Sequence, residues 1–125
     1  MIKPFIITFI ALSLLLTGCS SQSSQESAQA VSLANCLADN NVKEYGAFWC
    51  PNCAKQSKIF GKDAEAVLKS RGVYVECDPR GDNEQSILCI EKKIEKYPTW
   101  EFPNGQTLIG VFSLAELAQQ AGCPF

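Results

Sequence analysis

Two cysteines, Cys50 and Cys53, mark the point where the chain changes from a strand pattern to a helix pattern. Residues 42–49, VKEYGAFW, are rich in residue types that favour strands, and they run directly into Cys50. Pro51 then suits the first turn of a helix, because it lacks an N–H group that this position does not use. The sequence therefore predicts one thiol at the carboxyl end of a strand and a second thiol one helical turn later.

The rest of the chain predicts further helices and strands. Apolar residues recur at helical spacing in some segments, and strand-favouring runs are bounded by turn residues in others. In chain order we expect a helix at 31–40, a strand at 42–49, a helix from Pro51 to Gly72 that can bend at Gly61, a strand at 73–77, a helix capped by Asp82 or Asn83 that ends near Lys96, strands at 97–102 and 107–112, and a helix opened by the capping box of Ser113 and Glu116. The Asn104-Gly105 turn makes the last two strands a hairpin, because this pair accepts positive φ angles.

Residues 1–18 have the layout of an export signal. Lys3 supplies a positive charge, and the segment from Phe5 to Leu16 is apolar. This run is shorter than the stretch of about 20 residues that a membrane-spanning helix needs. The ending Leu16-Thr17-Gly18-Cys19 resembles the lipobox of bacterial lipoproteins, which implies cleavage before Cys19 and a lipid on its sulfur. The alternative is an ordinary cleaved signal beside a chance cysteine.

A polar segment separates this signal from the folded part. Residues 20–30, SSQSSQESAQA, have no aromatic residue and nothing to bury, so we expect 19–30 to be a lipidated cysteine and a flexible tether. Residues 31–125 are long enough for one compact domain. These boundaries predict an extracytoplasmic domain that is anchored by lipid, in the periplasm or on the outer face of the cell membrane.

The chain of 125 residues has no histidine, which excludes several kinds of site. Histidine is the usual general base and the commonest metal ligand, so its absence removes Cys-His nucleophiles and many metal sites. A formal charge of -2 provides no basic field for a nucleic acid. We therefore expect the chemistry to come from sulfur, carboxylates or lysine.

Three segments resemble the thioredoxin superfamily over about residues 33–123. They are FWCPNC at 48–53, the segment Tyr97-Pro98-Thr99, and the closing helix. The resemblance implies an α/β, thioredoxin-like fold in which helices flank a central mixed β-sheet. It also implies a thiol–disulfide oxidoreductase that needs no cofactor beyond its own redox-active disulfide.

A narrower resemblance is to the thioredoxin-like domain of bacterial vitamin K epoxide reductase homologues. It rests on YGAFWCPNC at 45–53, VECDPRGDN at 75–83 and YPTWEF at 97–102. Those enzymes make disulfides in exported proteins, with quinone as the final oxidant. The resemblance implies that this chain oxidises thiols of exported proteins. We expect a separate membrane protein to reoxidise it, either a vitamin K epoxide reductase homologue or a DsbB-like, quinone-linked partner.

The resemblance assigns roles to the residues around the two thiols. Cys50, at a helix N-terminus whose dipole favours a thiolate, is expected to be the reactive sulfur, and Cys53 to resolve mixed disulfides. Pro98 matches the family's cis-proline, which leaves the backbone of Tyr97 free to pair with an extended peptide. Glu44 matches a buried acid that takes the proton of Cys53. The alternative for Glu44 is a solvated charge at a strand end.

Four aromatic residues are candidates for a surface that docks unfolded chains: Phe48, Trp49, Tyr97 and Trp100. Trp49, next to the reactive sulfur, is the best placed for exposure, and with Tyr97 it is expected to bind substrate. For Phe48 and Trp100, packing in the core is an equal alternative.

The motif leaves the direction of electron flow open. DsbA-type oxidants have histidine at the position of Asn52, and the loss of a cationic neighbour stabilises a thiolate less. Strong oxidising power is therefore not carried over from the resemblance. The alternative function is a thiol–disulfide reductase or isomerase of the same compartment.

Four other cysteines are expected to form structural disulfides. Cys77 and Cys89 would close a short loop, where the related domains carry a pair, and a staple of this size contributes about 3 kcal/mol. Cys36 and Cys123 lie near the ends of the first and last helices, which share one pole in this topology. They can pair if their Cα atoms come within about 7 Å. The alternative for Cys77 and Cys89 is a relay that takes electrons from the active pair.

Two metal-binding alternatives remain. A zinc site of Cys50, Cys53, Cys77 and Cys89 has one Cys-x-x-Cys knuckle, but its second pair is spaced too widely, and an oxidising compartment opposes reduced thiolates. A copper-handling thioredoxin-like module would want a histidine or a methionine cluster, which the mature chain lacks. We therefore expect no metal site.

Overall fold

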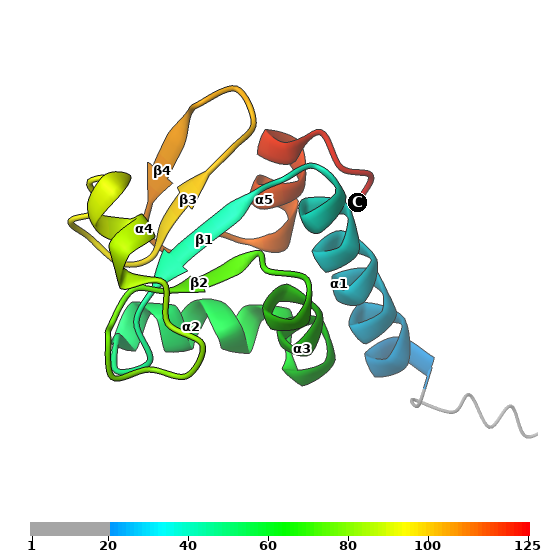
Figure 1. Cartoon of the computed structure of the whole chain (residues 1–125). Coiled ribbons are helices and arrows are strands. Elements are labelled where there is room, and N and C mark those ends of the chain that lie inside the picture. The colour runs from blue at the N-terminus through cyan, green and yellow to red at the C-terminus, as the bar shows by residue number, and fades with distance from the viewer. Residues whose placement is uncertain (1–20) are drawn as a thin grey trace, which may run out of the picture.

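The computed structural model describes residues 21–125, so the expected signal peptide and Cys19 lie outside the described residues. In chain order the described part contains α1 (Ser21–Asp39), β1 (Lys43–Gly46), α2 (Pro51–Phe60), α3 (Lys62–Ser70), β2 (Tyr74–Glu76), α4 (Ser86–Glu91), β3 (Thr99–Glu101), β4 (Thr107–Ile109) and α5 (Leu114–Ala121), as Figure 1 shows. The predicted order of helices and strands is confirmed, except that the long helix after Cys50 is divided in two.

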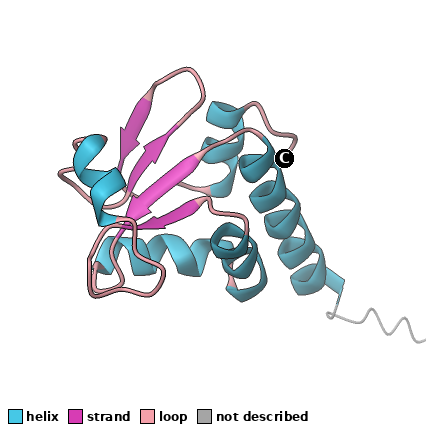
Figure 2. Ribbon diagram, viewed as in Figure 1, coloured by secondary structure: helices cyan, strands magenta, loops and turns pink. Residues whose placement is uncertain are grey.

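The four strands form one mixed sheet in the order β2-β1-β3-β4. β1 pairs in parallel with β2 and antiparallel with β3, and β3 pairs with β4 as the predicted hairpin. Helices flank this sheet (Figure 2). The protein therefore has the α/β, thioredoxin-like fold that the sequence predicted.

The two faces of the sheet are buried under different elements. Glu44 and Gly46 lie on one face of β1, because alternate residues of a strand point the same way. The main core is on this face, where Trp100, opposite Glu44 in the register, packs against Phe60 of α2. A smaller cluster covers the other face: Tyr45, Val75, Cys77 and Cys89.

Gly61 divides the helix predicted after Cys50 into α2 and α3. Its backbone has φ 81° and ψ 165°, which interrupts the helix and which residues with a side chain rarely adopt. The chain changes direction between α2 and α3 (Figure 1), and α3 packs against α1. The bend that the sequence allowed is therefore a complete break.

α1 begins at Ser21, so the segment expected to be a flexible tether is helical from this residue onward. The side chains at 23–29 are exposed, and Ala30 is the first buried one. Ser27 Oγ donates a hydrogen bond to Asp63 Oδ2 at 3.3 Å and connects this exposed part to α3. The low hydrophobicity correctly indicated exposed side chains at 23–29, but the end of the segment, Ala30, is part of the core. A helix can continue beyond the core against which it packs.

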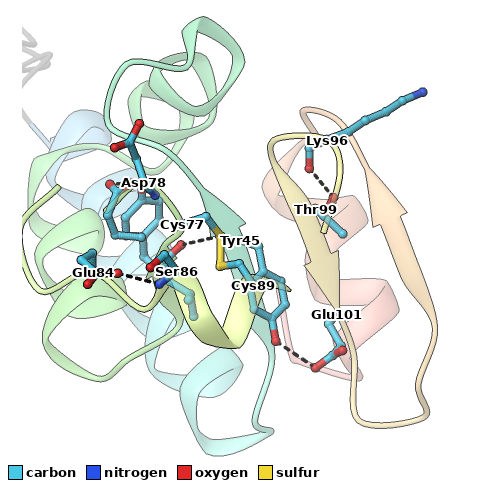
Figure 3. Close-up of a disulfide and its surroundings, with 12 residues drawn as sticks. Tyr45, Cys77, Asp78, Glu84, Ser86, Cys89, Lys96, Thr99 and Glu101 are labelled. Atoms are coloured by element: carbon cyan, nitrogen blue, oxygen red, sulfur yellow. Dashed lines mark hydrogen bonds between the residues drawn. A yellow bond between two sulfur atoms is a disulfide. The ribbon is translucent and has the colours of Figure 1, made fainter. Parts of the chain in front are cut away.

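α4 starts later and ends earlier than predicted. Its N-cap is Gln85, whereas Asn83, one of the two expected caps, has φ 51° in the preceding loop. Glu84 Oε2 accepts a hydrogen bond from the backbone N–H of Ser86 at 2.7 Å and so provides a partner at the helix start (Figure 3). Lys93, with φ 56°, lies outside the helical region just after the helix ends.

A disulfide joins the first helix to the end of the chain. Cys36 in α1 is bonded to Cys123, with Cα atoms 6.0 Å apart. Gly122, in the left-handed conformation, ends α5 and brings Cys123 to α1. Beside this bond, Asn40 Nδ2 donates to the carbonyl of Ala121 at 2.8 Å. The first and last helices are therefore held together covalently and by a hydrogen bond.

Removing the Cys36–Cys123 disulfide should destabilise the domain more than removing Cys77–Cys89. The first spans a sequence separation of 87 and the second a separation of 12, and a longer closed loop takes more entropy from the unfolded chain. In urea unfolding, Cys36→Ser/Cys123→Ser should lose about 4.6 kcal/mol and Cys77→Ser/Cys89→Ser about 3 kcal/mol. Equal losses in the two variants would contradict this explanation.

Candidate active site

The loop after β1 delivers Cys50 to the start of a helix. β1 ends at Gly46, and Cys50 is the N-cap of α2, with extended backbone and Pro51 as the first helical residue. The Cys50 sulfur accepts a hydrogen bond from the backbone N–H of Cys53 at 3.2 Å. A sulfur atom thus takes the place that an oxygen usually has at a helix N-cap. The predicted thiol at the start of a helix is present, but the strand ends at Gly46 and not at residue 49, so a loop at 47–49 separates it from Cys50.

Both cysteines are free thiols that are largely buried, with 6% of Cys50 and 7% of Cys53 exposed. The Tyr97-Pro98 peptide bond is cis, and the Cys50 thiol lies 3.7 Å from the carbonyl oxygen of Tyr97. Tyr97 also packs against the cluster of Ala47 and the two cysteines. Two segments that lie far apart in the sequence therefore meet at the Cys50 sulfur.

Glu44 is buried on the face of β1 that carries the main core, with 3% of its surface exposed. Burial, and then the charge of Glu65, raise the pKa of this carboxyl from its ordinary 4.5 to about 8, against an opposing effect of Lys69. The alternative of a solvated charge is therefore wrong. Near neutral pH this carboxyl is mostly protonated and able either to give or to take a proton.

Cys53 holds its proton firmly. Burial is the main reason why the pKa of Cys53 lies well above its ordinary value, and a hydrogen bond with Cys50 adds to the effect. The charge of Glu44 acts on the same thiol in the same direction. Because only a thiolate attacks a disulfide, this thiol needs a base close to it.

Two exposed aromatic side chains form an apolar rim on the active-site loop, with 60% of Phe48 and 53% of Trp49 exposed. Trp49 Nε1 donates a hydrogen bond to Asp78 Oδ2 at 2.6 Å, and its ring meets that of Tyr97 edge-on at 6.1 Å. Arg80 forms an ion pair with Asp78 at 2.7 Å and lies 5.7 Å over the ring of Phe48. The loop after β2 therefore holds both aromatic side chains in place.

Trp100 is not part of this rim. It is fully buried and packs against Phe60, with ring centroids 6.2 Å apart. Core packing, one of the two alternatives for Trp100 and Phe48, is therefore correct for Trp100, whereas Phe48 is exposed.

The Cys77–Cys89 disulfide lies on the other face of the sheet, with Cα atoms 5.7 Å apart (Figure 3). It packs with Tyr45, whose hydroxyl donates to Glu101 Oε1 at 3.2 Å. Tyr97 contacts this cluster as well as the one around the active thiols. The bond ties α4 to the end of β2, and it joins two of the four sulfurs that the alternative zinc site would need.

Within residues 21–125, no group of three or more histidine, cysteine, aspartate or glutamate side chains is placed to hold a metal ion. In the same part of the chain, no helix combines the length and the apolar character needed to cross a membrane.

A cavity of about 580 Å³ lies beside Cys53, and sequence analysis did not find it. Tyr74 and Glu76 of β2 line it, together with Glu65 and Lys69 of α3. The available signal was that Tyr74 and Glu76 share one face of their strand. Only the register of β2 against β1 places that face beside the second thiol.

Gly46 allows Tyr74 and Cys53 to approach each other. A Cβ atom at this position would lie 2.9 Å from Tyr74 Cε2 and 3.0 Å from Cys53 Sγ. These distances are shorter than ordinary contacts between side chains, so the space above Gly46 is already filled.

Comparison with known proteins points to one kind of chemistry. No protein-family model matches the chain. The thiol-disulfide oxidoreductase LTO1 of Arabidopsis thaliana is 40% identical over 103 residues. The match covers 80% of this chain but 26% of the relative, so the chain spans only a small part of that protein's length.

Glu44 should make the domain less stable as the pH rises. In the unfolded chain its carboxyl ionises near its ordinary pKa of 4.5, whereas in the folded protein its pKa is about 8. Between these values the folded state keeps a proton that the unfolded state has lost, so stability should fall by up to about 1.4 kcal/mol per pH unit. Urea unfolding from about pH 5 to about pH 8 should show a flatter dependence in Glu44→Gln. The exposed Glu95→Gln is the control, and an unchanged slope in Glu44→Gln would argue against a buried, titrating carboxyl.

Gly46→Ala should destabilise the protein and disturb the second thiol. The added methyl group would collide with Tyr74 or with Cys53 Sγ, and overpacking of this kind costs about 1–3 kcal/mol. Thermal unfolding should report the loss, and alkylation in a Cys50→Ser background should report faster modification of Cys53. If both measurements are unchanged, the close approach of these side chains does not exist in solution.

Proposed function

We propose that this protein is an extracytoplasmic thiol–disulfide oxidoreductase that oxidises thiols of exported proteins through Cys50-Pro51-Asn52-Cys53. The observation that carries the proposal is the position of the Cys50 sulfur, which caps α2 and lies 3.7 Å from the carbonyl of Tyr97. The similarity to a thiol-disulfide oxidoreductase supports the same chemistry. The reaction needs no redox group other than the disulfide itself.

In the oxidised protein a substrate thiolate attacks Cys50 Sγ of the Cys50–Cys53 disulfide. A bond between the substrate sulfur and Cys50 forms, the Cys50–Cys53 bond breaks, and Cys53 leaves with the electron pair and takes up a proton. A second substrate thiolate then attacks the substrate sulfur of this mixed disulfide and releases Cys50. Two electrons have passed from the substrate to the cysteine pair, and the substrate has gained a disulfide.

Glu44 is the acid that protonates Cys53 in this step and the base that deprotonates it when the pair is reoxidised. Its pKa of about 8 suits both roles near neutral pH, because the two protonation states are then both accessible. Its charge acts on the Cys53 thiol, which places the two groups in one electrostatic environment.

Substrate binds as an extended peptide beside Pro98. The backbone of Tyr97 provides hydrogen-bonding groups next to the Cys50 sulfur, and a peptide in this position can pair with them. Trp49, together with the exposed ring of Phe48, provides apolar surface for side chains of an unfolded chain. This mode of binding recognises the backbone and the apolar side chains of a substrate peptide more than its particular sequence.

The partner that reoxidises the pair is a separate membrane protein, either a vitamin K epoxide reductase homologue or a DsbB-like protein linked to quinone. Residues 1–18 act as the signal peptide, and a lipid on Cys19 keeps the domain at the periplasmic or outer surface of the membrane. The Cys77–Cys89 disulfide is structural and not a relay, because it packs with Tyr45 and Val75 in a cluster separate from the one that contains Cys50 and Cys53.

A reductase or isomerase of the same compartment is the second candidate. Asn52 favours it, because an uncharged residue between the two cysteines gives less support to a thiolate than the histidine of strong oxidants. The equilibrium constant of the Cys50/Cys53 couple against glutathione separates the two functions, since a strong oxidant and a thioredoxin-like reductant differ widely in potential.

Cys50→Ser should abolish oxidation of a reduced test protein, because the sulfur that substrate attacks is gone. Cys53→Ser should instead accumulate a mixed disulfide between Cys50 and a disulfide-containing test protein, because the resolving thiol is missing. Non-reducing electrophoresis and mass spectrometry measure both outcomes. Full activity in Cys50→Ser would end the proposal.

A further inference from the structure

The acid that serves Cys53 is separated from water. Only 3% of Glu44 is exposed, and the described residues that line the neighbouring cavity do not include it. Each cycle of the proposed reaction moves a proton on or off Cys53. The proton must therefore cross from a buried acid to solvent, and the following inference rests on the proposed function.

β2 supplies polar groups between Glu44 and the cavity. In the parallel pairing of β1 and β2, Glu44 lies beside Tyr74, and Gly46 lies beside Glu76. These positions share one face of the sheet. Tyr74 and Glu76 both line the cavity, where Glu76 is 5% exposed.

Tyr74 extends across Gly46 to the second thiol. The position that a Gly46 Cβ would take is 3.0 Å from Cys53 Sγ and 3.4 Å from Tyr74 Oη. The phenol therefore lies close to the thiol and beside its acid, at a point where the neighbouring strand has no side chain.

Glu76 holds the phenol in this position. The Tyr74 hydroxyl donates a hydrogen bond to Glu76 Oε2 at 3.0 Å, and the backbone N–H of Asp78 donates to Glu76 Oε1 at 2.9 Å. Burial, followed by the charge of Glu76 and this hydrogen bond, raises the pKa of Tyr74. The hydroxyl thus keeps its own proton, and it can accept another on its oxygen as it passes the first one on.

We propose that Tyr74 and Glu76 form the outlet through which the proton shared by Cys53 and Glu44 reaches the water of the cavity. In reoxidation, Cys53 attacks Cys50 of a mixed disulfide, the Cys53–Cys50 bond forms, and the partner leaves with the electron pair. The Cys53 proton passes to Glu44. A proton then moves from Glu44 to the oxygen of Tyr74, its register neighbour on β2, as the hydroxyl proton passes to Glu76 and on to the water of the cavity.

Tyr74 and Glu76 act on the reaction through Glu44 and Cys53, so they are positioning residues and not catalytic residues. Other titratable groups face the same region and contribute to its pH dependence. They are Glu65 and Lys69 from α3, Asp78 and Asp82 from the loop after β2, and Tyr97 before β3.

The test uses the full chain, reduced, with oxidised glutathione as the partner disulfide. Acid quenching and mass spectrometry follow the formation and decay of the Cys50–glutathione adduct from about pH 5 to about pH 9. Tyr74→Phe and Glu76→Gln should slow the decay at least about threefold near neutral pH and approach the unmodified rate at high pH, where hydroxide takes the proton. Adduct formation should not change. Asp82→Asn, at the exposed rim of the same cavity, is the matched control for loss of a charge.

Double variants test whether the outlet lies in series with Glu44. If it does, Glu44→Gln/Tyr74→Phe should decay no more slowly than Glu44→Gln alone. Additive losses would overturn the proposal, as would a slowing by the same factor at every pH or an unchanged decay in both single variants.

Melting curves identify variants that fail to fold, and Tyr74→Phe keeps the ring that fills the space above Gly46. If the Cys53→Ser variant forms no glutathione adduct on Cys50, this result contradicts the proposed function and not the proton outlet.

Discussion

The central position of β1 in the sheet is the constraint on which the site depends. Because β1 pairs with β2 on one edge and with β3 on the other, its carboxyl end is held from both sides. The chain leaves the sheet at Gly46 and, after the short loop at 47–49, continues as α2, whose N-cap is Cys50. The same two pairings bring Tyr74 from β2 and Tyr97, just before β3, to this point. One strand therefore brings together the Cys50 thiol, the backbone of Tyr97 at which we propose that peptides bind, and the residues of the proposed proton outlet.

The core buries two polar side chains, Gln56 of α2 and Glu44 of β1, and their polar groups differ in how burial is compensated. Gln56 is fully buried and fully paired, since its amide donates to the carbonyl of Phe112 at 3.0 Å and accepts from the N–H of the same residue at 2.9 Å. Because its buried amide is hydrogen-bonded, Gln56 has a structural role. The charge of Lys69 offsets only part of the effect of burial on Glu44, so this carboxyl stays largely protonated near neutral pH. An acid held in this state is useful for moving protons and poor as a structural element.

Local signals were sufficient for the order of elements, because they act over a few residues. Pro51 at a helix start, the turn before Gln106 and the capping box of Ser113 all lie where the sequence predicted. The extent of α1 was not predictable in this way, since its exposed turns bury nothing and leave no apolar pattern. The depth of the break at Gly61 was not predictable either, because a glycine permits a left-handed backbone conformation without requiring it.

By itself, the sequence determined that two thiols stand one helical turn apart at a strand-to-helix junction, and that a Tyr97-Pro98 segment precedes the hairpin, because both are local patterns. Tertiary structure alone decided that Glu44 is buried, and that Tyr74 and Glu76 lie beside the second thiol. The physical reason is strand register. The alternation within one strand shows which residues share a face, but only pairing with the next strand shows which neighbours that face will meet.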